Sequence, residues 1–526
     1  NNCMGVTELV LSLAIAGCIH SLVAGCPMAV LRPTGPITLF IIKLYGLAEN
    51  LKVDFFEWFA WVGLWVGVYM VLIAAFDLCR HIRLATRYLH DMFAFFVCTI
   101  YIHDGIAGVA GLWPDPAKQQ GDRKFWQDDN CASYGCAYFS IILFCITLFG
   151  ALALNAITST RLVNEFGRAV IKDYALTIAV FVAIGVGYTS ASAQDRLFPN
   201  EQYIPHITLP TKFTPTFNGL PSHSYTNREW WVGLTLEKSP LLGEYNGTAG
   251  ESSANTDVCG EVDGCGFNGP AIFYAAIAAI PITFWFYFDQ LFSCLLHQIG
   301  MGPNGHNLAK GAYYHSSFMW MGIFNMFLPM FGLPFVTASL PHSPQFVRAL
   351  QIRDEATRRV TKVVDNRVSP FLMYLFCGLA LFIPTSAGPK LLELIPKGVV
   401  YGILTFVGVA GILPETGNQF SKRLLLLFSF PSEFPKDEPY SGVPTKTMHL
   451  FTFFQAAALI ICWVITLSSG FGSSQFWQYL GIFFPLWIVA LIPIRKKLIP
   501  KFIREHDLTA YLDTEDEQLS EPSVTF

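Results

Sequence analysis

Two segments far apart in the chain combine proline, glycine, hydroxyl and basic residues within otherwise apolar sequence. The first reads Cys26-Pro-Met-Ala-Val-Leu-Arg-Pro-Thr-Gly-Pro36, and the second reads Gly332-Leu-Pro-Phe-Val-Thr-Ala-Ser-Leu-Pro-His-Ser-Pro344. Irregular backbone at membrane depth is tolerated only where it is buried in protein or lines a wet cavity. A half-helix that starts there points free N–H groups and its positive dipole end into the cavity, which favours an anion. Two such interrupted segments in corresponding halves of a chain are typical of a binding site near the bilayer midplane.

Several side chains of these segments could contact an anion. Arg32 would bring a full positive charge, and Thr34, Thr337 and Ser339 would bring hydroxyl donors. His342 stands between two prolines, and an imidazole in the site would make its function pH-sensitive. The alternative is structural: two proline-kinked helices, and a histidine that is satisfied in the core.

Asp289 is the second chemical signal, because it lies deep in the apolar stretch from Phe284 to Ser293. A carboxylate there is costly, so it is expected to face a cavity and to have a function. Ser293 follows one helical turn later on the same face. The two residues could coordinate a cation, or Asp289 alone could carry a proton. The alternative is a hydrogen-bonded structural aspartate; Asp91 is expected to be an ion-pair partner of Arg87.

Membrane-spanning elements must position these residues. Hydrophobic residues make up 53% of the chain and charged residues 14%, with a mean hydropathy of +0.43, so lipid must be the solvent for much of the surface. We therefore predict an all-α polytopic membrane protein, with residues 1–526 forming a single transmembrane domain. Spans that match a ~30 Å hydrocarbon core are expected at 5–24, 58–78, 90–111, 134–156, 173–191, 270–297, 315–333, 369–388, 396–413, 447–468 and 475–494, with half-helices near 34–46 and 342–352.

Basic residues predict the orientation of the chain. They gather in the loops at 80–87, 161–172 and 422–423 and after the last span at 495–504, all on one side of the membrane if the spans alternate. That side is expected to be cytoplasmic. The chain begins at Asn1 rather than at Met, so its true N-terminus is expected to be missing.

The opposite loops are expected to be extracellular. These are the loops at 112–133 and 192–269. The loop at 192–269 is predicted to form a lid over the membrane domain, and its sequon at Asn246 suggests glycosylation.

Two cysteine pairs in these loops are candidate disulfides: Cys131 with Cys136, and Cys259 with Cys265.

The segment 505–526 is acidic and is expected to be a mobile cytoplasmic tail. The small net charge of −4 gives no reason to expect a nucleic-acid partner.

Several stretches resemble the membrane domain of solute carrier family 4, which comprises band 3-like anion exchangers, sodium-coupled bicarbonate transporters and, more distantly, borate transporters. The matching stretches run nearly end to end: Met4-Gly-Val-Thr-Glu-Leu-Val, Thr34-Gly-Pro, Arg87-Tyr, Tyr287-Phe-Asp-Gln, Gly332-Leu-Pro, Asp365-Asn-Arg-Val-Ser, Arg423-Leu-Leu-Leu-Leu-Phe, Met448-His-Leu-Phe-Thr and Leu512-Asp-Thr-Glu-Asp. The resemblance implies two inverted seven-segment repeats with the first segment missing here. It also implies core and gate domains, a homodimer formed through the gate, and elevator-type alternating access.

The resemblance also assigns site residues. The coupling carboxylate of the family falls on Asp289, with Ser293 as the hydroxyl that sodium-coupled members have one turn on. Exchangers typically have Glu at the position of Asp289 and an arginine at that of His342, so this chain departs from their pattern twice. Arg32 occupies a position usually taken by a small residue, and we hypothesise that the positive charge has moved from the second interrupted segment to the first. The anion site of the family falls on Arg32, Pro33, Thr34, Gly35, Thr337, Ala338, Ser339, Leu340 and His342.

The leading functional hypothesis is bicarbonate transport, coupled to Na⁺ or H⁺ through Asp289, with no cofactor beyond a transported Na⁺. Leu340-Pro-His-Ser-Pro344 resembles the borate branch, so borate transport stays an alternative, as does Na⁺-independent anion exchange. An enzyme is disfavoured because the sequence has no His-Glu-x-x-His and no Gly-x-Ser-x-Gly motif. A scaffold that binds partners through its tail is the remaining class, since the tail resembles the proposed carbonic anhydrase contact of the family. The plasma membrane is favoured, with an internal membrane as the alternative.

Overall fold

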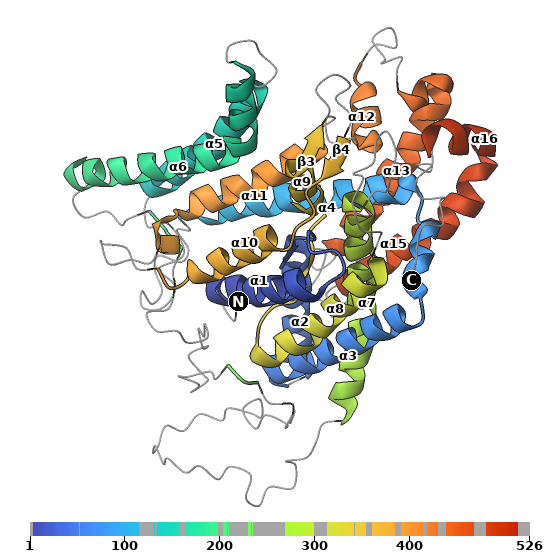
Figure 1. The fold of residues 1–526 in the computed structure, drawn as a ribbon, viewed down its shortest axis with the longest axis horizontal. Helices are drawn as coiled ribbons and strands as arrows, with labels where there is room; N and C mark the ends of the chain where they lie inside the picture. Colours follow the sequence, from blue (N-terminus) through green and yellow to red (C-terminus); the bar gives the residue numbers. More distant parts are fainter. Residues whose placement is uncertain are drawn as a thin grey trace, which may run out of the picture.

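The described residues fold into a bundle of helices (Figure 1). The computed structural model describes residues 4–51, 53–114, 131, 134–157, 164–197, 204–207, 209, 230–232, 234, 269–298, 313–340, 342–353, 360–383, 391–413, 418–429, 438–467 and 480–513. Its principal helices are α1 (Val6–Val23), α2 (Gly35–Leu51), α3 (Phe55–Ala75), α4 (Arg87–Gly111), α5 (Tyr134–Ile157), α6 (Glu165–Leu197), α7 (Gly269–His297), α8 (Tyr314–Phe327), α9 (His342–Ala349), α10 (Val368–Leu379), α11 (Lys397–Ile412), α12 (Gln419–Leu426), α13 (Thr445–Thr466) and α15 (Phe484–Pro493).

Six of the described helices are long and apolar enough to cross a bilayer: α1, α3, α4, α5, α7 and α13. Their outer faces carry large apolar side chains, among them Phe149, Phe273 and Phe453, each at least 61% exposed. A water-soluble surface does not carry so many apolar side chains, whereas lipid accommodates them. The prediction of an all-α polytopic membrane protein is confirmed.

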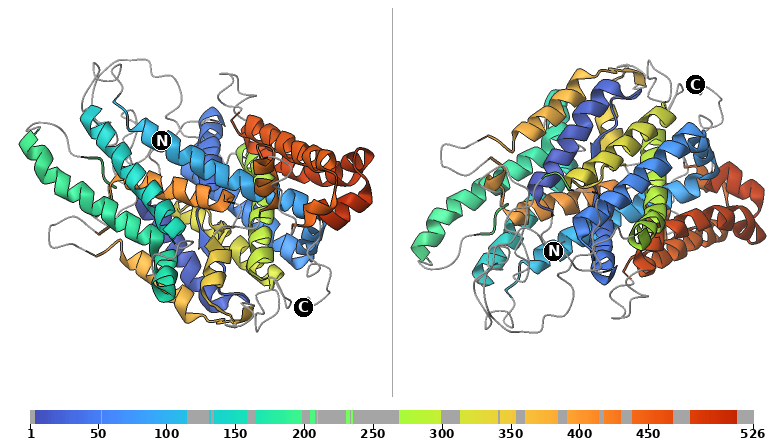
Figure 2. Two further views of the ribbon diagram at one scale, coloured as in Figure 1. Left: turned by 90° about the horizontal axis from the view of Figure 1, so that it is seen from above. Right: turned by 90° about the horizontal axis from the view of Figure 1, so that it is seen from below.

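The helices pack in two groups. In the first group α3 lies against α7 and α8, and α1 lies against α10; in the second, α11 packs on α4 and α5, and α5 packs on α6. Figure 2 shows α6 at one end of the molecule and the C-terminal helices at the other. Small residues permit close approach of the backbones in both groups. A Cβ at Gly67 of α3 would stand 2.8 Å from the Gly322 carbonyl of α8, and one at Gly105 of α4 would stand 2.9 Å from the Tyr401 carbonyl of α11.

Two short antiparallel ladders complete the described structure. Strand β1 (Leu31–Arg32) pairs with β2 (Thr337–Ala338), and β3 (Gln351–Arg353) pairs with β4 (Val360–Val363). Gly332 precedes β2 with φ 64°, a left-handed conformation that glycine adopts without the Cβ clash. The β1–β2 ladder therefore joins the two interrupted segments in space.

The start of the tail differs from the expectation. We predicted a mobile segment from residue 505, but Leu508, Leu512 and Asp513 are at most 3% exposed. Two leucines in the apolar core and a paired aspartate explain why this part of the tail is packed. Most of the 192–269 loop, with Asn246, Cys259 and Cys265, lies outside the described residues.

Candidate functional site

The two interrupted segments meet in the β1–β2 ladder. Arg32 stands opposite Thr337, and Leu31 stands opposite Ala338. The ladder continues beyond the strands, because the Ser339 amide donates to the Val30 carbonyl over 2.9 Å, and the Val30 amide donates to the Ser343 hydroxyl over 3.0 Å. This pairing brings helix α2, which starts at Gly35, and helix α9, which starts at His342, to one place in the molecule.

Side chains from three other helices satisfy the remaining backbone groups of the ladder. The Tyr374 hydroxyl of α10 accepts from the Leu31 amide over 2.7 Å, and the Gln290 Oε1 of α7 accepts from the Ala338 amide over 2.9 Å. Asn325 of α8 exchanges two hydrogen bonds with the backbone of Val336. Unpaired backbone groups are costly in an apolar interior, so these bonds are what permits an extended ladder at this depth.

Arg32 reaches from β1 toward helix α4. Its Nη2 donates to the Tyr101 hydroxyl over 3.4 Å, and its guanidinium carbon lies 5.9 Å from the centre of the Tyr101 ring. Ser339 also contacts the Tyr101 hydroxyl, and its own hydroxyl lies 3.0 Å from Nδ1 of His342. Arg32, Tyr101, Ser339 and His342 therefore form one polar cluster at the ladder.

Asp289 of α7 borders the same cluster. Its side chain is buried, at 2% exposure. Its carboxyl group interacts electrostatically with the Thr337 hydroxyl and with the Arg32 guanidinium. Ser293 lies four residues further along α7 and is fully buried. Carboxylate and hydroxyl oxygens on adjacent turns are the ligand type that hard cations bind in proteins.

Several polar atoms of this cluster point into protein without a hydrogen-bond partner. Among the described residues these include Arg32 Nε, Thr34 Oγ1 and Asp289 Oδ2. Thr34 directly precedes α2 and is 4% exposed. A helix N-terminus that is combined with an unpaired guanidinium N–H and an unpaired hydroxyl is suited to a small anion. We call Arg32, Thr34, Gly35, Tyr101, Asp289, Thr337, Ser339 and His342 the central site.

The structure brings the predicted site residues together, and it adds residues that sequence reasoning missed. Pro33 connects β1 to α2, Ala338 lies in β2, and Leu340 packs in the apolar core at 5% exposure. Gln290 was missed although it follows Asp289 directly in the sequence. Tyr101 and Tyr374 lie within apolar helices, and nothing in the sequence around them indicates that they belong to the site.

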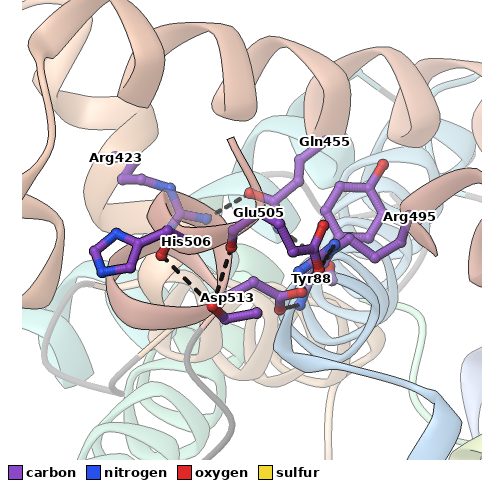
Figure 3. Close-up of polar contacts among 8 residues, drawn as sticks. Tyr88, Arg423, Gln455, Arg495, Glu505, His506 and Asp513 are labelled. Carbon is purple, nitrogen blue, oxygen red and sulfur yellow. Dashed lines mark hydrogen bonds and ion pairs between the residues drawn. The ribbon is translucent and has the colours of Figure 1, made fainter. Parts of the chain in front are cut away.

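A second buried polar cluster lies at the C-terminal end of the described chain (Figure 3). Asp513 accepts a hydrogen bond from the Tyr88 amide over 2.6 Å in the first turn of α4, and it also pairs with Arg495. Arg423 of α12 donates to Gln455 of α13, whose amide in turn donates to the Tyr88 carbonyl. Burial raises the pKa of Asp513, and Arg495 opposes that shift. The tail residue Asp513 is thus engaged internally.

Two further sequence expectations can be located in the structure. Arg87 Nε lies 3.7 Å from Asp91 Oδ2, which confirms the predicted ion pair. Cys131 and Cys136 are joined as a disulfide.

Comparisons with known proteins match most of this chain to one family. The family described as "HCO3- transporter integral membrane domain" matches residues 1–135 and 264–517. The chain is 24% identical to the electrogenic sodium bicarbonate cotransporter 1 of Ambystoma tigrinum, over 97% of this chain and 49% of that protein. It is also 24% identical to the anion exchange protein 3 of Rattus norvegicus, over 98% of this chain and 38% of that protein. The chain thus spans about half the length, or less, of these curated relatives.

One solved structure aligns with most of this chain. The transmembrane domain of the cyanobacterial bicarbonate transporter BicA aligns with 87% of this chain and 89% of its own, at 12% identity and a TM-score of 0.48. The homologues are transporters and not enzymes. The family match covers well over half of the chain, and we conclude that the protein belongs to the bicarbonate transporter family and carries its integral membrane domain.

Proposed function

We propose that the protein transports bicarbonate through the central site and couples this transport to Na⁺ or H⁺ at Asp289. The observation that carries the proposal is the Arg32–Thr337 pairing, which unites both interrupted segments around buried, unsatisfied polar atoms. A monovalent oxyanion would replace the missing partners of Arg32 Nε and Thr34 Oγ1. The printed names of the relatives, bicarbonate cotransporter and anion exchange protein, support the choice of substrate.

Arg32 would supply the positive charge of the site. The resemblance to exchangers leads us to expect an arginine at the position of His342, in the second interrupted segment. Here the guanidinium comes from the first segment, directly across the ladder from Thr337. An arginine at the position of His342 could reach the same space, because His342 contacts Ser339 in the polar cluster that also holds Arg32.

Asp289 would bind the coupling cation. The Thr337 hydroxyl and Arg32 act on its carboxyl group, so the cation and the anion would bind side by side. Each would lower the electrostatic cost of the other, which is the physical basis of symport.

Alternating access would arise from movement of one helix group against the other, and the homodimer would form through the α4–α11 group. Arg32 and Tyr101 support this arrangement because their contact joins the two groups at the central site. We expect the protein to lie in the plasma membrane with a glycosylated extracellular loop.

Borate transport is the second candidate within this fold, since the borate anion has the same charge and a similar size. The resemblance of residues 340–344 to the borate branch is the observation in its favour. Na⁺-independent anion exchange is the third candidate, and it would need no coupling cation at Asp289.

The test is reconstitution of the full-length protein in liposomes loaded with a pH dye. Bicarbonate influx and borate influx are each measured with and without a Na⁺ gradient. Bicarbonate influx that requires Na⁺ and is lost in Asp289→Ala is the expected result. Borate influx without bicarbonate influx would overturn the choice of substrate.

A further inference from the structure

A second carboxyl group, that of Asp104 on helix α4, lies beside the central site. A Cβ built on Gly35, at the start of α2, would stand 3.3 Å from Asp104 Oδ2 and 3.2 Å from Tyr101 Cε1. Asp104 follows Tyr101 by three residues on α4, so both side chains share a helical face. That face is the one that meets Arg32, through the Tyr101 hydroxyl. Asp104 therefore faces the N-terminal end of α2, where the proposed anion would bind.

Asp104 is paired with an imidazole. His103 Nδ1 lies 3.0 Å from Asp104 Oδ1, and the two side chains are 47% and 27% exposed. The His103 ring also packs on Trp463 of α13, with the ring centres 5.5 Å apart. An imidazole is a poor ligand for Na⁺, which prefers oxygen, but a ring nitrogen at this distance from a carboxyl oxygen can share a proton with it.

The charged and titratable groups round Asp104 come from three described helices and β1. On α4 itself they are Tyr101 and His103, and β1 brings Arg32. Helix α11 packs on α4 beside it through Tyr401, whose ring stands against Gly108. Lys43 lies two turns beyond Gly35 on α2, about 12 Å further along the helix axis, and its buried Nζ has no hydrogen-bond partner among the described residues.

The charges of Asp289, Asp104 and Arg32 together decide how favourably a monovalent anion can bind. Asp289 and Asp104, both ionised, would outnumber the single guanidinium of Arg32 at the central site. A monovalent anion would then enter a site of its own sign, which is electrostatically unfavourable. A cation at Asp289 offsets one carboxylate, and the second carboxylate also needs neutralisation.

We propose that Asp104, together with His103, binds a proton whenever a monovalent anion occupies the central site. The inference rests on the proposed transport function and deepens it, because it adds a proton-binding residue on the helix that faces α2. Uptake of the proton removes the repulsion between Asp104 and the anion, and loss of the proton on the other side of the membrane favours release of the anion. Asp289 would remain the site of the coupling cation.

The experiment measures the apparent KM for bicarbonate in liposomes at saturating Na⁺, from a series of bicarbonate concentrations at each pH. One linked proton makes KM rise up to tenfold per pH unit above the titration range. Asp104→Asn, which is always neutral, is expected to flatten this slope and to keep the low KM at high pH. Asp104→Glu, the matched control, is expected to retain the slope. If Asp104→Asn does not fold, Asp104→Ser takes its place, because its smaller side chain also fits against Gly35.

The outcomes separate the two proposals. If the wild type transports chloride but not bicarbonate, the substrate proposal fails, and the same slopes are then measured with chloride. If Asp104→Asn has the same pH slope as the wild type with the transported anion, the proton-binding role of Asp104 is wrong.

Discussion

Arg32 and Thr337 stand directly opposite each other in a ladder of two residues per strand, although they come from segments far apart in the chain. The pairing places a guanidinium from the first interrupted segment beside a hydroxyl from the second, and both act on the carboxyl group of Asp289. A charge, a hydroxyl and a carboxylate are therefore contributed by three separate elements to one buried position.

Replacement of Arg32 by alanine is expected to abolish anion transport and to leave folding intact. The guanidinium would make charge-assisted hydrogen bonds, each worth about 1.5–3 kcal/mol, so transport should fall at least tenfold. Arg80→Ala is the matched control, since Arg80 is exposed in the loop after α3. Unchanged anion uptake by a monodisperse Arg32→Ala protein would exclude the proposed role of Arg32.

Asp289→Asn is expected to abolish the bicarbonate influx that a Na⁺ gradient drives. The amide keeps the size of the side chain but offers a cation no negative charge, so coupling is lost while the fold is kept. The measurement compares influx with and without a Na⁺ gradient. A Na⁺ stimulation equal to that of the wild type would show that the cation binds elsewhere.

Tyr374→Phe is expected to destabilise the β1–β2 ladder. Its hydroxyl bonds the Leu31 amide at 2.7 Å and lies 3.3 Å from the Ala29 carbonyl, and an unsatisfied buried amide costs about 1–3 kcal/mol. The melting temperature in detergent should therefore fall. Tyr138→Phe removes the hydroxyl of a 57% exposed tyrosine and should change the melting temperature little. Equal melting temperatures for the two variants would contradict the role given to Tyr374.

Asp513→Ala is expected to lower the stability of the protein. The substitution removes the partner of Arg495, which is 5% exposed, and of the Tyr88 amide in the first turn of α4. Loss of one partner from a buried ion pair costs about 3–5 kcal/mol. Glu505→Ala is the control, because the Glu505 side chain is 61% exposed and lies 3.8 Å from Arg495. A melting temperature for Asp513→Ala that matches this control would disprove the prediction.

Glu438 is expected to contribute stability at neutral pH that is lost in acid. Partial burial raises its pKa, but hydrogen bonds from Lys422 and Gln419 outweigh burial, so the pKa lies below its usual value. A carboxyl whose pKa is lower in the folded state stabilises above its unfolded pKa, and this contribution disappears as pH falls through the folded value. Wild type and Glu438→Gln should therefore differ in melting temperature at pH 7 and converge in acid. A difference that does not depend on pH would argue against this linkage.

The sequence alone was sufficient for the fold class and for most of the central site. Long apolar stretches predict spanning helices because lipid leaves the backbone few other ways to satisfy its hydrogen bonds. Proline, glycine and hydroxyl residues at membrane depth marked both interrupted segments for the same reason. A buried carboxylate is costly, which singled out Asp289.

Only the tertiary structure decided which of these residues meet. The register that places Arg32 opposite Thr337 depends on contacts between distant segments, and Gln290, Asn325 and Tyr374 satisfy the backbone of that ladder from three other helices. Tyr101 and Asp104 were not predicted because their role arises from packing of α4 against the start of α2. Asp513 was assigned to a mobile tail, yet it satisfies an amide of α4. The local sequence shows that a polar residue in an apolar segment has a free-energy cost in lipid. The partner that offsets this cost comes from a distant part of the chain, so only the tertiary structure identifies it.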